Sequence, residues 1–200
     1  MNDKKDSYHK DNLHQTLLEA ATQLLEEKGS SEFSLRELAR VAGVSHTAPY
    51  RHFKDKSALL RGIAQQGFDE LHDAMQAARQ SHEDVEQQLV EAGVSYVLQT
   101  VSYPERTRLM FSGMLEIDPD DDVFIQSCCS AYDVLRLIIQ TGIDQSIFKG
   151  DLDSITLAAW SSVHGMSMLN TMGVNLDIKN EDDLKQRARL LAKQVINGFK

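Results

Sequence analysis

The sequence predicts an all-α protein of about nine helices. Apolar residues recur at intervals of three and four through most of the 200 residues, which is the spacing of one face of a helix. No run of alternating apolar and polar residues rich in Val, Ile and Thr predicts a β-sheet. Proline occurs only at positions 49, 104 and 119, so little interrupts the helical pattern.

Two helices are expected near the N-terminal end. The first has apolar residues in helical register over residues 13–24 and ends at Gly29. The second opens at Ser34, with Glu37 three residues further on in a capping-box pattern, and ends at Gly43.

Six longer helices follow a short third one. Proline suits the first turn of a helix, and acidic residues suit its N-terminal end. These helices are expected from Asp55 to about residue 80, from Ser81, from Pro104 to about Leu115, from residues 118–122 to about Ile147, from Gly150 to Met172, and from about Glu181 to Phe199.

The short third helix lies in the polar stretch VSHTAPYRHF, residues 44–53, which two apolar residues bracket. A helix, a glycine turn and a second helix make a helix-turn-helix. Val44 and Phe53 are expected to anchor this stretch, so the residues between them should face outward. Pro49 fits only in a first turn, which predicts a cap near His46 or Thr47 and a helix of about two turns.

Charge is distributed unevenly along the chain. The formal net charge is −9, which excludes a global attraction to nucleic acid. Residues 31–65 nevertheless carry +3, leaving −12 on the rest. Any nucleic-acid contact is therefore expected at this segment.

The stretch SLRELARVAGVSHTAPYRHFKDKSALL resembles the DNA-binding signature of the TetR/AcrR family of bacterial transcriptional regulators. The resemblance covers roughly the first 60 residues and rests on Leu35, Ala39, Ala42, Gly43, Val44, Ser45, Tyr50, His52, Phe53, Lys56 and Leu59. It implies contacts from Tyr50, Lys56 and Arg36 to DNA phosphates. It also implies base contacts from the recognition segment, whose DNA-binding residues are Ser45, His46, Thr47, Ala48, Pro49 and His52. Pro49 stands where the family commonly has an aliphatic residue.

A second stretch, from Trp160 to Gly165, resembles a Trp-x-x-x-His-Gly signature of one subgroup of TetR C-terminal domains. This resemblance implies a ligand pocket, expected near Phe111, Tyr132, Trp160, His164 and Met168. For His164, a satisfied interior histidine is the favoured alternative to a ligand contact.

The last two helices have two possible roles. They either pack within the chain or form a dimer seam, which the family resemblance implies. The seam residues are Ala158, Ser162, Gly165, Leu184, Ala188, Leu191 and Val195. A dimer would let two recognition helices read a palindrome.

No cofactor or metal site is expected. Asp118, Asp120 and Asp122 have the first spacings of an EF-hand loop, but Val123 and Cys129 replace its glycine and glutamate. The adjacent cysteines, Cys128 and Cys129, predict reduced, packed thiols in a cytoplasmic protein. Neither a secretory signal nor a membrane span is expected.

These patterns predict a homodimeric, ligand-responsive regulator that binds double-stranded DNA and is not an enzyme. Residues 1–60 are expected to bind DNA, residues 55–80 to form a linking helix, and residues 70–200 to form a regulatory and dimerisation domain. The resemblance implies repression. An all-α enzyme or small-molecule-binding protein without a DNA role, and a regulator controlled by a protein partner, are the alternatives. The sequence does not identify the operator, the regulated genes or the effector.

Overall fold

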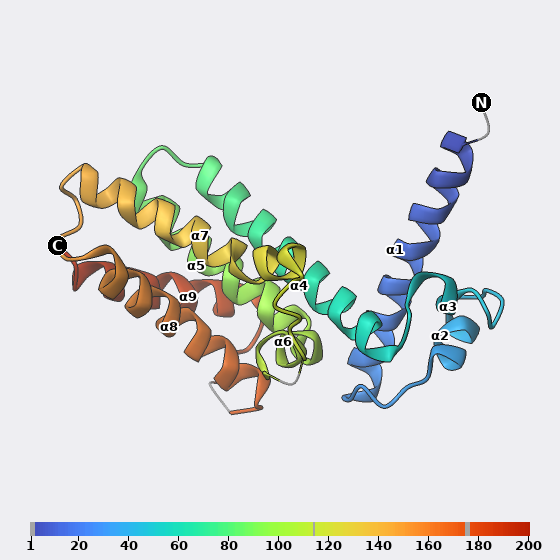
Figure 1. The fold of residues 1–200 in the computed structure, drawn as a ribbon. Coiled ribbons are helices and arrows are strands. Elements are labelled where there is room, and N and C mark those ends of the chain that lie inside the picture. The colour runs from blue at the N-terminus through green and yellow to red at the C-terminus, as the bar shows by residue number, and fades with distance from the viewer. Residues whose placement is uncertain (1–2, 114, 175–176) are drawn as a thin grey trace. The chain divides into compact units, whose positions relative to one another are not determined.

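The computed structural model describes residues 3–113, 115–174 and 177–200, with side chains from residue 12 onward. Within these residues the chain forms nine α-helices and no strand (Figure 1). The helices are α1 (Asp3–Lys28), α2 (Leu35–Val41), α3 (Pro49–His52), α4 (Lys56–Gln80), α5 (Val85–Ser102), α6 (Pro104–Phe111), α7 (Asp122–Asp144), α8 (Leu152–Thr171) and α9 (Glu181–Asn197). The all-α prediction is confirmed.

Side-chain caps fix several of the predicted helix starts. Asp55 accepts a hydrogen bond from the Ala58 N–H at 2.8 Å and so caps α4. The predicted start of α5 at Ser81 is wrong, because the Ser81 hydroxyl donates to the carbonyl of Ala78 in α4 at 2.9 Å. Asp84 caps α5 instead, accepting from the Gln87 N–H at 2.8 Å.

The chain divides into two compact units. The first comprises Met1–Gly67 and Glu105–Asp118, and the second comprises Phe68–Pro104 and Pro119–Lys200. Helix α6 therefore clusters with the N-terminal helices, although 37 residues separate it from them in sequence. Its position in the first unit was not foreseen from the sequence.

Two contacts place α6 within the first unit. The Glu26 carboxylate of α1 accepts the backbone N–H groups of Glu105 at 3.1 Å and Arg106 at 2.8 Å, and so caps the start of α6. Gly67 of α4 leaves room for the same helix, since a Cβ there would lie 2.5 Å from the Met110 sulfur. The Glu26 carboxylate thus fixes α6 to α1, and the absence of a side chain at Gly67 lets α6 pack closely on α4.

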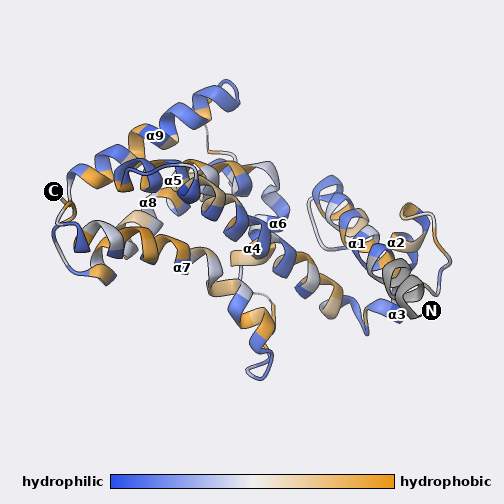
Figure 2. Cartoon of the chain, turned by 90° about the horizontal axis from the view of Figure 1, so that it is seen from above, coloured by the Kyte–Doolittle hydropathy of each residue, from blue (hydrophilic) through white to orange (hydrophobic). Residues whose placement is uncertain are grey.

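The second unit is built around α5, which packs against α7, α8 and α9. Nine residues of α5 are buried, as expected for a helix that is covered on most sides. Figure 2 shows apolar residues along these helices. Arg189 of α9 binds Glu91 of α5 through Nε at 2.8 Å and Nη2 at 2.9 Å, and this hydrogen-bonded pair lowers the pKa of Glu91.

Candidate nucleic-acid interface and interior cavity

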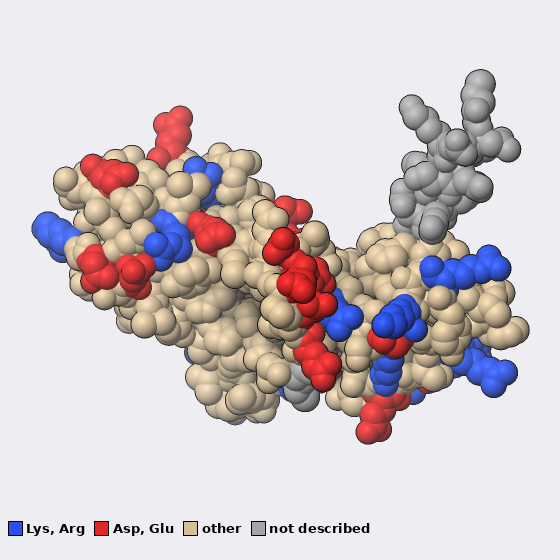
Figure 3. All heavy atoms as spheres, in the orientation of Figure 1, with Lys and Arg blue, Asp and Glu red and all other residues tan. Residues whose placement is uncertain are grey.

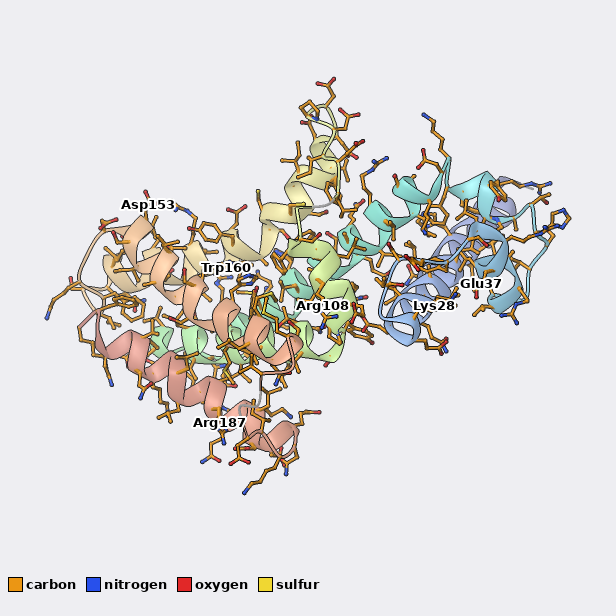
Figure 4. All side chains as sticks on the ribbon, turned by 90° about the horizontal axis from the view of Figure 1, so that it is seen from below. Lys28, Glu37, Arg108, Asp153, Trp160 and Arg187 are labelled. Atoms are coloured by element: carbon orange, nitrogen blue, oxygen red, sulfur yellow. The ribbon has the colours of Figure 1, made fainter. Side chains whose placement is uncertain are left out.

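Helix α2 is the scaffold of the predicted recognition segment. Ser34 Oγ accepts a hydrogen bond from the Glu37 N–H at 3.1 Å, which confirms the predicted cap. The Glu37 carboxylate pairs with Lys28 of α1 at 3.0 Å, and Figure 4 labels both side chains. Helix α2 is therefore tied to α1 at its N-terminal end.

The turn after α2 depends on Gly43. Its φ of +66° lies in the left-handed region, where side chains other than glycine are strained. The Val44 N–H then returns to the Ala39 carbonyl at 3.0 Å and closes the end of α2. The sharp turn predicted between α2 and the next helix is confirmed.

The predicted two-turn recognition helix is wrong in its length and its start. Helix α3 has four residues and begins at Pro49, with Ala48 at the N-cap. Because Pro49 has no N–H, it cannot donate to the Ser45 carbonyl as an α-helix would require. The Ala48 N–H donates to that carbonyl instead, at 2.9 Å, so a tight turn precedes a single turn of α-helix.

The expectation that every residue between Val44 and Phe53 faces outward is wrong for two of them. Ala48 is 7% exposed and Pro49 is buried, because both pack α3 onto the first unit together with Phe53. Val44 is half-buried. Ala48 and Pro49 therefore offer little side-chain surface to a base edge.

The remaining residues of the segment do face solvent. Ser45, His46 and Thr47 are exposed, and the Ser45 and Thr47 hydroxyl oxygens lie 3.3 Å apart. Tyr50 is 58% exposed, and Arg51 is exposed beside it. The outward face thus runs over residues 45–47 and 50–51.

The other predicted DNA-binding residues lie on α2, α3 and α4. Arg36 is exposed on α2, and Lys56 begins α4 with its ammonium 5.4 Å from the centroid of the Phe33 ring. His52 is half-buried, 5.8 Å from His14 between ring centroids. The roles of these residues toward DNA remain predictions.

Three exposed cations were counted in the charge of the segment but not assigned a role. They are Arg40, Arg51 and Lys54. Figure 3 shows Lys and Arg side chains on the same part of the chain. The register of α2 and α3 makes these side chains exposed. Arg51 could therefore have been identified from the sequence only if the start of α3 had been predicted correctly.

The second unit encloses a small cavity of about 20 Å³, enough for about one water molecule. Residues from α4, α5, α7, α8 and α9 line it: Met75, Leu89, Gly93, Tyr96, Leu135, Ala159, Trp160, Ser162, Val163, Ala192 and Val195. Of the predicted pocket residues, Trp160 lines this cavity (labelled in Figure 4). The lining is mostly apolar, as in many ligand sites.

Aromatic rings pack around Trp160. The ring centroids of Tyr96 and Tyr132 lie 4.9 Å and 5.4 Å from it, both edge-on, and the His164 ring stacks on it at 6.5 Å. Tyr132 and His164 therefore contact Trp160 but do not line the cavity themselves. Met168 is half-buried on α8, and Phe111 lies on α6 in the first unit. Their place in a pocket stays a prediction.

Four polar residues, Tyr96, Thr100, His164 and Ser167, form what we call the α5–α8 polar seam. Tyr96 Oη lies 2.7 Å from His164 Nδ1, and the hydroxyl oxygens of Thr100 and Ser167 are 2.8 Å apart. Burial raises the pKa of Tyr96 and lowers the pKa of His164. Both shifts favour the neutral phenol and the neutral imidazole, which this hydrogen bond joins. Sequence reasoning missed Tyr96, Thr100 and Ser167, which carry no motif.

The residues predicted for a dimer seam fall into two groups. Leu184 and Ala188 are 6% and 0% exposed, which fits packing within the chain. The buried stripe of α9 continues along the i, i+4 row to Ala192 and Ile196 rather than to Leu191 and Val195 as predicted. The other seam residues keep exposed surface: Ala158 is exposed, and Ser162, Gly165, Leu191 and Val195 are half-buried.

Among the described residues, no three His, Cys, Asp or Glu side chains gather in a way that could hold a metal ion. Cys128 is half-buried and Cys129 is exposed, so the expectation of packed thiols is wrong for Cys129. No helix within residues 3–113, 115–174 and 177–200 is long and apolar enough to span a membrane.

The helix, glycine turn and short helix with an outward polar face define a helix-turn-helix protein. Residues 17–63 match the family described as bacterial regulatory proteins, tetR family. The HTH-type transcriptional regulator AcrR of Shigella flexneri is 47% identical over 49 residues. Residues 17–63 are therefore similar to the DNA-binding domain of tetR-family transcriptional regulators.

The match to AcrR covers 24% of this chain and 23% of that protein, so the chain spans less than a quarter of its length. Solved structures share the fold over nearly the whole chain. A protein of unknown function from Rhodococcus sp. RHA1 has a TM-score of 0.79 at 28% identity, covering 94% of this chain and 95% of that one. A tetR-family regulatory protein from Rhodococcus RHA1 has a TM-score of 0.74 at 20% identity, covering 92% and 96%. FadR from Bacillus subtilis, solved with stearoyl-CoA, has a TM-score of 0.71 at 14% identity, covering 93% and 99%.

Proposed function

We propose that the chain is a ligand-responsive repressor that binds a palindromic operator as a homodimer. The outward polar face of residues 45–47 and 50–51 is the observation that carries this proposal. Pro49 and Phe53 are buried and anchor the backbone of this segment, so the exposed face has a fixed geometry. A fixed, polar and locally basic face suits the groove and phosphates of a duplex.

The roles of the two ends of the chain follow from this assignment. Residues 1–60 bind operator DNA in the cytoplasm, and residues 70–200 respond to the effector and dimerise. Within residues 1–60, Tyr50 and Arg36 contact phosphates, and Ser45, His46 and Thr47 approach base edges. Their exposure supports these roles.

The effector binds in the interior of the second unit. The cavity at Trp160 is the natural starting point, because its lining is apolar and the polar seam lies beside it. Its volume of about 20 Å³ requires that the surrounding helices separate to admit a ligand. The stearoyl-CoA complex of FadR supports testing acyl-CoA thioesters first.

The homodimer forms through the exposed face of α8 and α9. Leu157 of α8 is 62% exposed and Leu190 of α9 is 59% exposed, beside small residues such as Ala158. Exposed apolar side chains of this size on two adjacent helices favour burial against a second copy. Two copies would read a palindrome whose half-sites match the dimer's symmetry.

Selection of bound duplexes from a random pool by the purified full chain tests the DNA-binding role. A palindromic consensus is expected, with affinity falling steeply as salt rises. Lys56→Ala should weaken binding to all duplexes alike and lower the magnitude of the salt slope by about 1. Recovery of no duplex above background would contradict the proposed function.

Sedimentation tests the dimer. Leu157→Arg should produce monomers, because the new charge would be buried at the interface. Leu137→Arg is the matched control, since Leu137 is 47% exposed on α7 of the same unit. Equal behaviour of both variants would place the interface elsewhere. Titration of acyl-CoA against the fluorescence of Trp160, the single tryptophan, tests the effector site.

A further inference from the structure

We infer that Arg51 determines operator specificity by reading a guanine in each half-site. This inference rests on the proposed function, which assigns DNA binding to the segment without saying which side chain discriminates between bases. It concerns a residue that the sequence motif left without a role.

The start of α3 decides which side chains face outward. Because the helix begins at Pro49, Ala48 and Pro49 turn into the first unit, and Tyr50 and Arg51 turn away from it. Arg51 is the only lysine or arginine within α3. It therefore occupies the outward side of the element that a helix-turn-helix places in the major groove.

The Arg51 guanidinium is available for such a contact. No carboxylate among the described residues pairs with it, whereas Lys28 is held by Glu37 at 3.0 Å. Lys56 lies over the Phe33 ring. Arg51 thus keeps a charge that is free to meet DNA.

The backbone beneath Arg51 is fixed on both sides. The Arg51 N–H donates to the Ala48 carbonyl at 3.1 Å, and the Phe53 N–H donates to the Pro49 carbonyl at 2.9 Å. Phe53, at the C-cap of α3, is 4% exposed. A long side chain on a fixed backbone position can reach the same base in every complex, because the range of positions of its end is restricted.

The chemistry of the side chain selects the base. Guanidinium has donors in a planar fork and no acceptor. In the major groove, guanine presents two neighbouring acceptors, O6 and N7. Adenine instead presents one acceptor, N7, next to a donor, its N6 amino group. Arginine therefore matches guanine in a bidentate manner, and the other residues of the face have no such fork.

The test is selection of duplexes from a random pool by the wild type, Arg51→Ala and Arg51→Lys. The wild-type consensus should contain an invariant G·C pair in each half-site. Arg51→Ala should lose preference at that pair and keep the rest of the consensus, whereas Arg51→Lys should keep part of the preference, because an ammonium can also donate to O6 and N7. Replacing the guanine by adenine should weaken wild-type binding roughly 10- to 100-fold and leave Arg51→Ala nearly indifferent.

Lys54→Ala is the matched control, because Lys54 is an exposed cation just beyond α3. It should lower affinity for every duplex and leave the consensus unchanged. If Arg51→Ala behaves in the same way, with the guanine preference intact, Arg51 is a phosphate contact and the inference is wrong. If the wild type selects no duplex at all, the proposed function itself fails.

Discussion

Residues 45–51 of the first unit and the α5–α8 polar seam of the second unit both gather polar side chains, but they turn them in opposite directions. In the first, hydroxyls, an imidazole and a guanidinium face solvent, while Ala48 and Pro49 anchor the backbone. In the second, Tyr96 and Ser167 are each 0% exposed and their polar atoms are paired within the unit.

The difference shows how each group of polar side chains can act. Exposed polar side chains on an anchored backbone stay hydrated until a large polar partner displaces the water bound to them. Inward groups must satisfy one another, because an unpaired buried polar atom is costly. The first arrangement suits recognition, and the second holds two helices in register around a small cavity.

The largest expected effect is on the stability of the first unit, when the buried residue that anchors the outward face is changed. Phe53→Ala should lower the free energy of unfolding of the first unit by about 3–5 kcal/mol, because it leaves a cavity where a 4% exposed ring was. Thermal unfolding followed by circular dichroism measures this loss. Trp160 fluorescence reports the second unit separately, and its transition should stay in place.

Tyr50→Ala is the control on the opposite side of the same helix. Since Tyr50 is 58% exposed, stability should change by no more than about 0.5 kcal/mol while duplex binding weakens. Equal destabilisation by both changes would show that α3 has no distinct inner and outer sides.

The next largest effect concerns the inward pairs. Ser167→Ala should cost about 1–2 kcal/mol, because it removes the hydrogen bond between the Thr100 and Ser167 hydroxyls, while the Thr100 hydroxyl keeps its bond to the Tyr96 carbonyl at 2.8 Å. Adding Thr100→Val should cost little more, because the bond between the two hydroxyls is already lost. Denaturant unfolding measures both.

Ser162→Ala tests whether burial is responsible. Ser162 is a half-buried serine of the same helix whose hydroxyl bonds the Ala158 carbonyl at 2.8 Å. Its removal should cost less than about 0.5 kcal/mol. A loss as large as that of Ser167→Ala would mean that α8 helicity, not the seam, sets the effect.

A smaller effect is expected where α6 joins the first unit. Glu26→Ala should cost about 0.5–2 kcal/mol, as the loss of a helix cap does. Hydrogen exchange of the Glu105 and Arg106 amides should quicken, because the carboxylate accepts both. The exposed neighbour Glu27, changed to Ala, should leave those two amides unaffected; quickening in both variants would contradict the capping role.

The smallest effect is the pH dependence of stability that arises from His164 in the α5–α8 polar seam. Burial lowers the pKa of His164 in the folded protein, so the unfolded chain takes up the proton first. The free energy of unfolding should therefore fall as pH drops below about 6.5. His164→Gln should reduce that fall, and denaturant titrations at several pH values measure the difference. Parallel pH profiles for the two proteins would show that His164 takes no part.

Local sequence determined the elements whose stabilising contacts lie within a few residues. Ser34 caps α2 through Glu37, Asp55 caps α4 through Ala58, and Gly43 supplies the positive φ of the turn. Such contacts join residues three or four apart, so the pattern in the chain is enough to predict them. The all-α fold and the helix-turn-helix were predictable for this reason.

Tertiary structure decided the contacts between distant segments. Glu26 caps a helix 79 residues away, and Tyr96 meets an imidazole 68 residues away. No spacing in the sequence encodes these pairs, because they depend on how whole helices pack. The start of α3 lies between the two cases: the missing N–H of Pro49 is a local fact, but the burial of Ala48 and Pro49 comes from packing against the first unit.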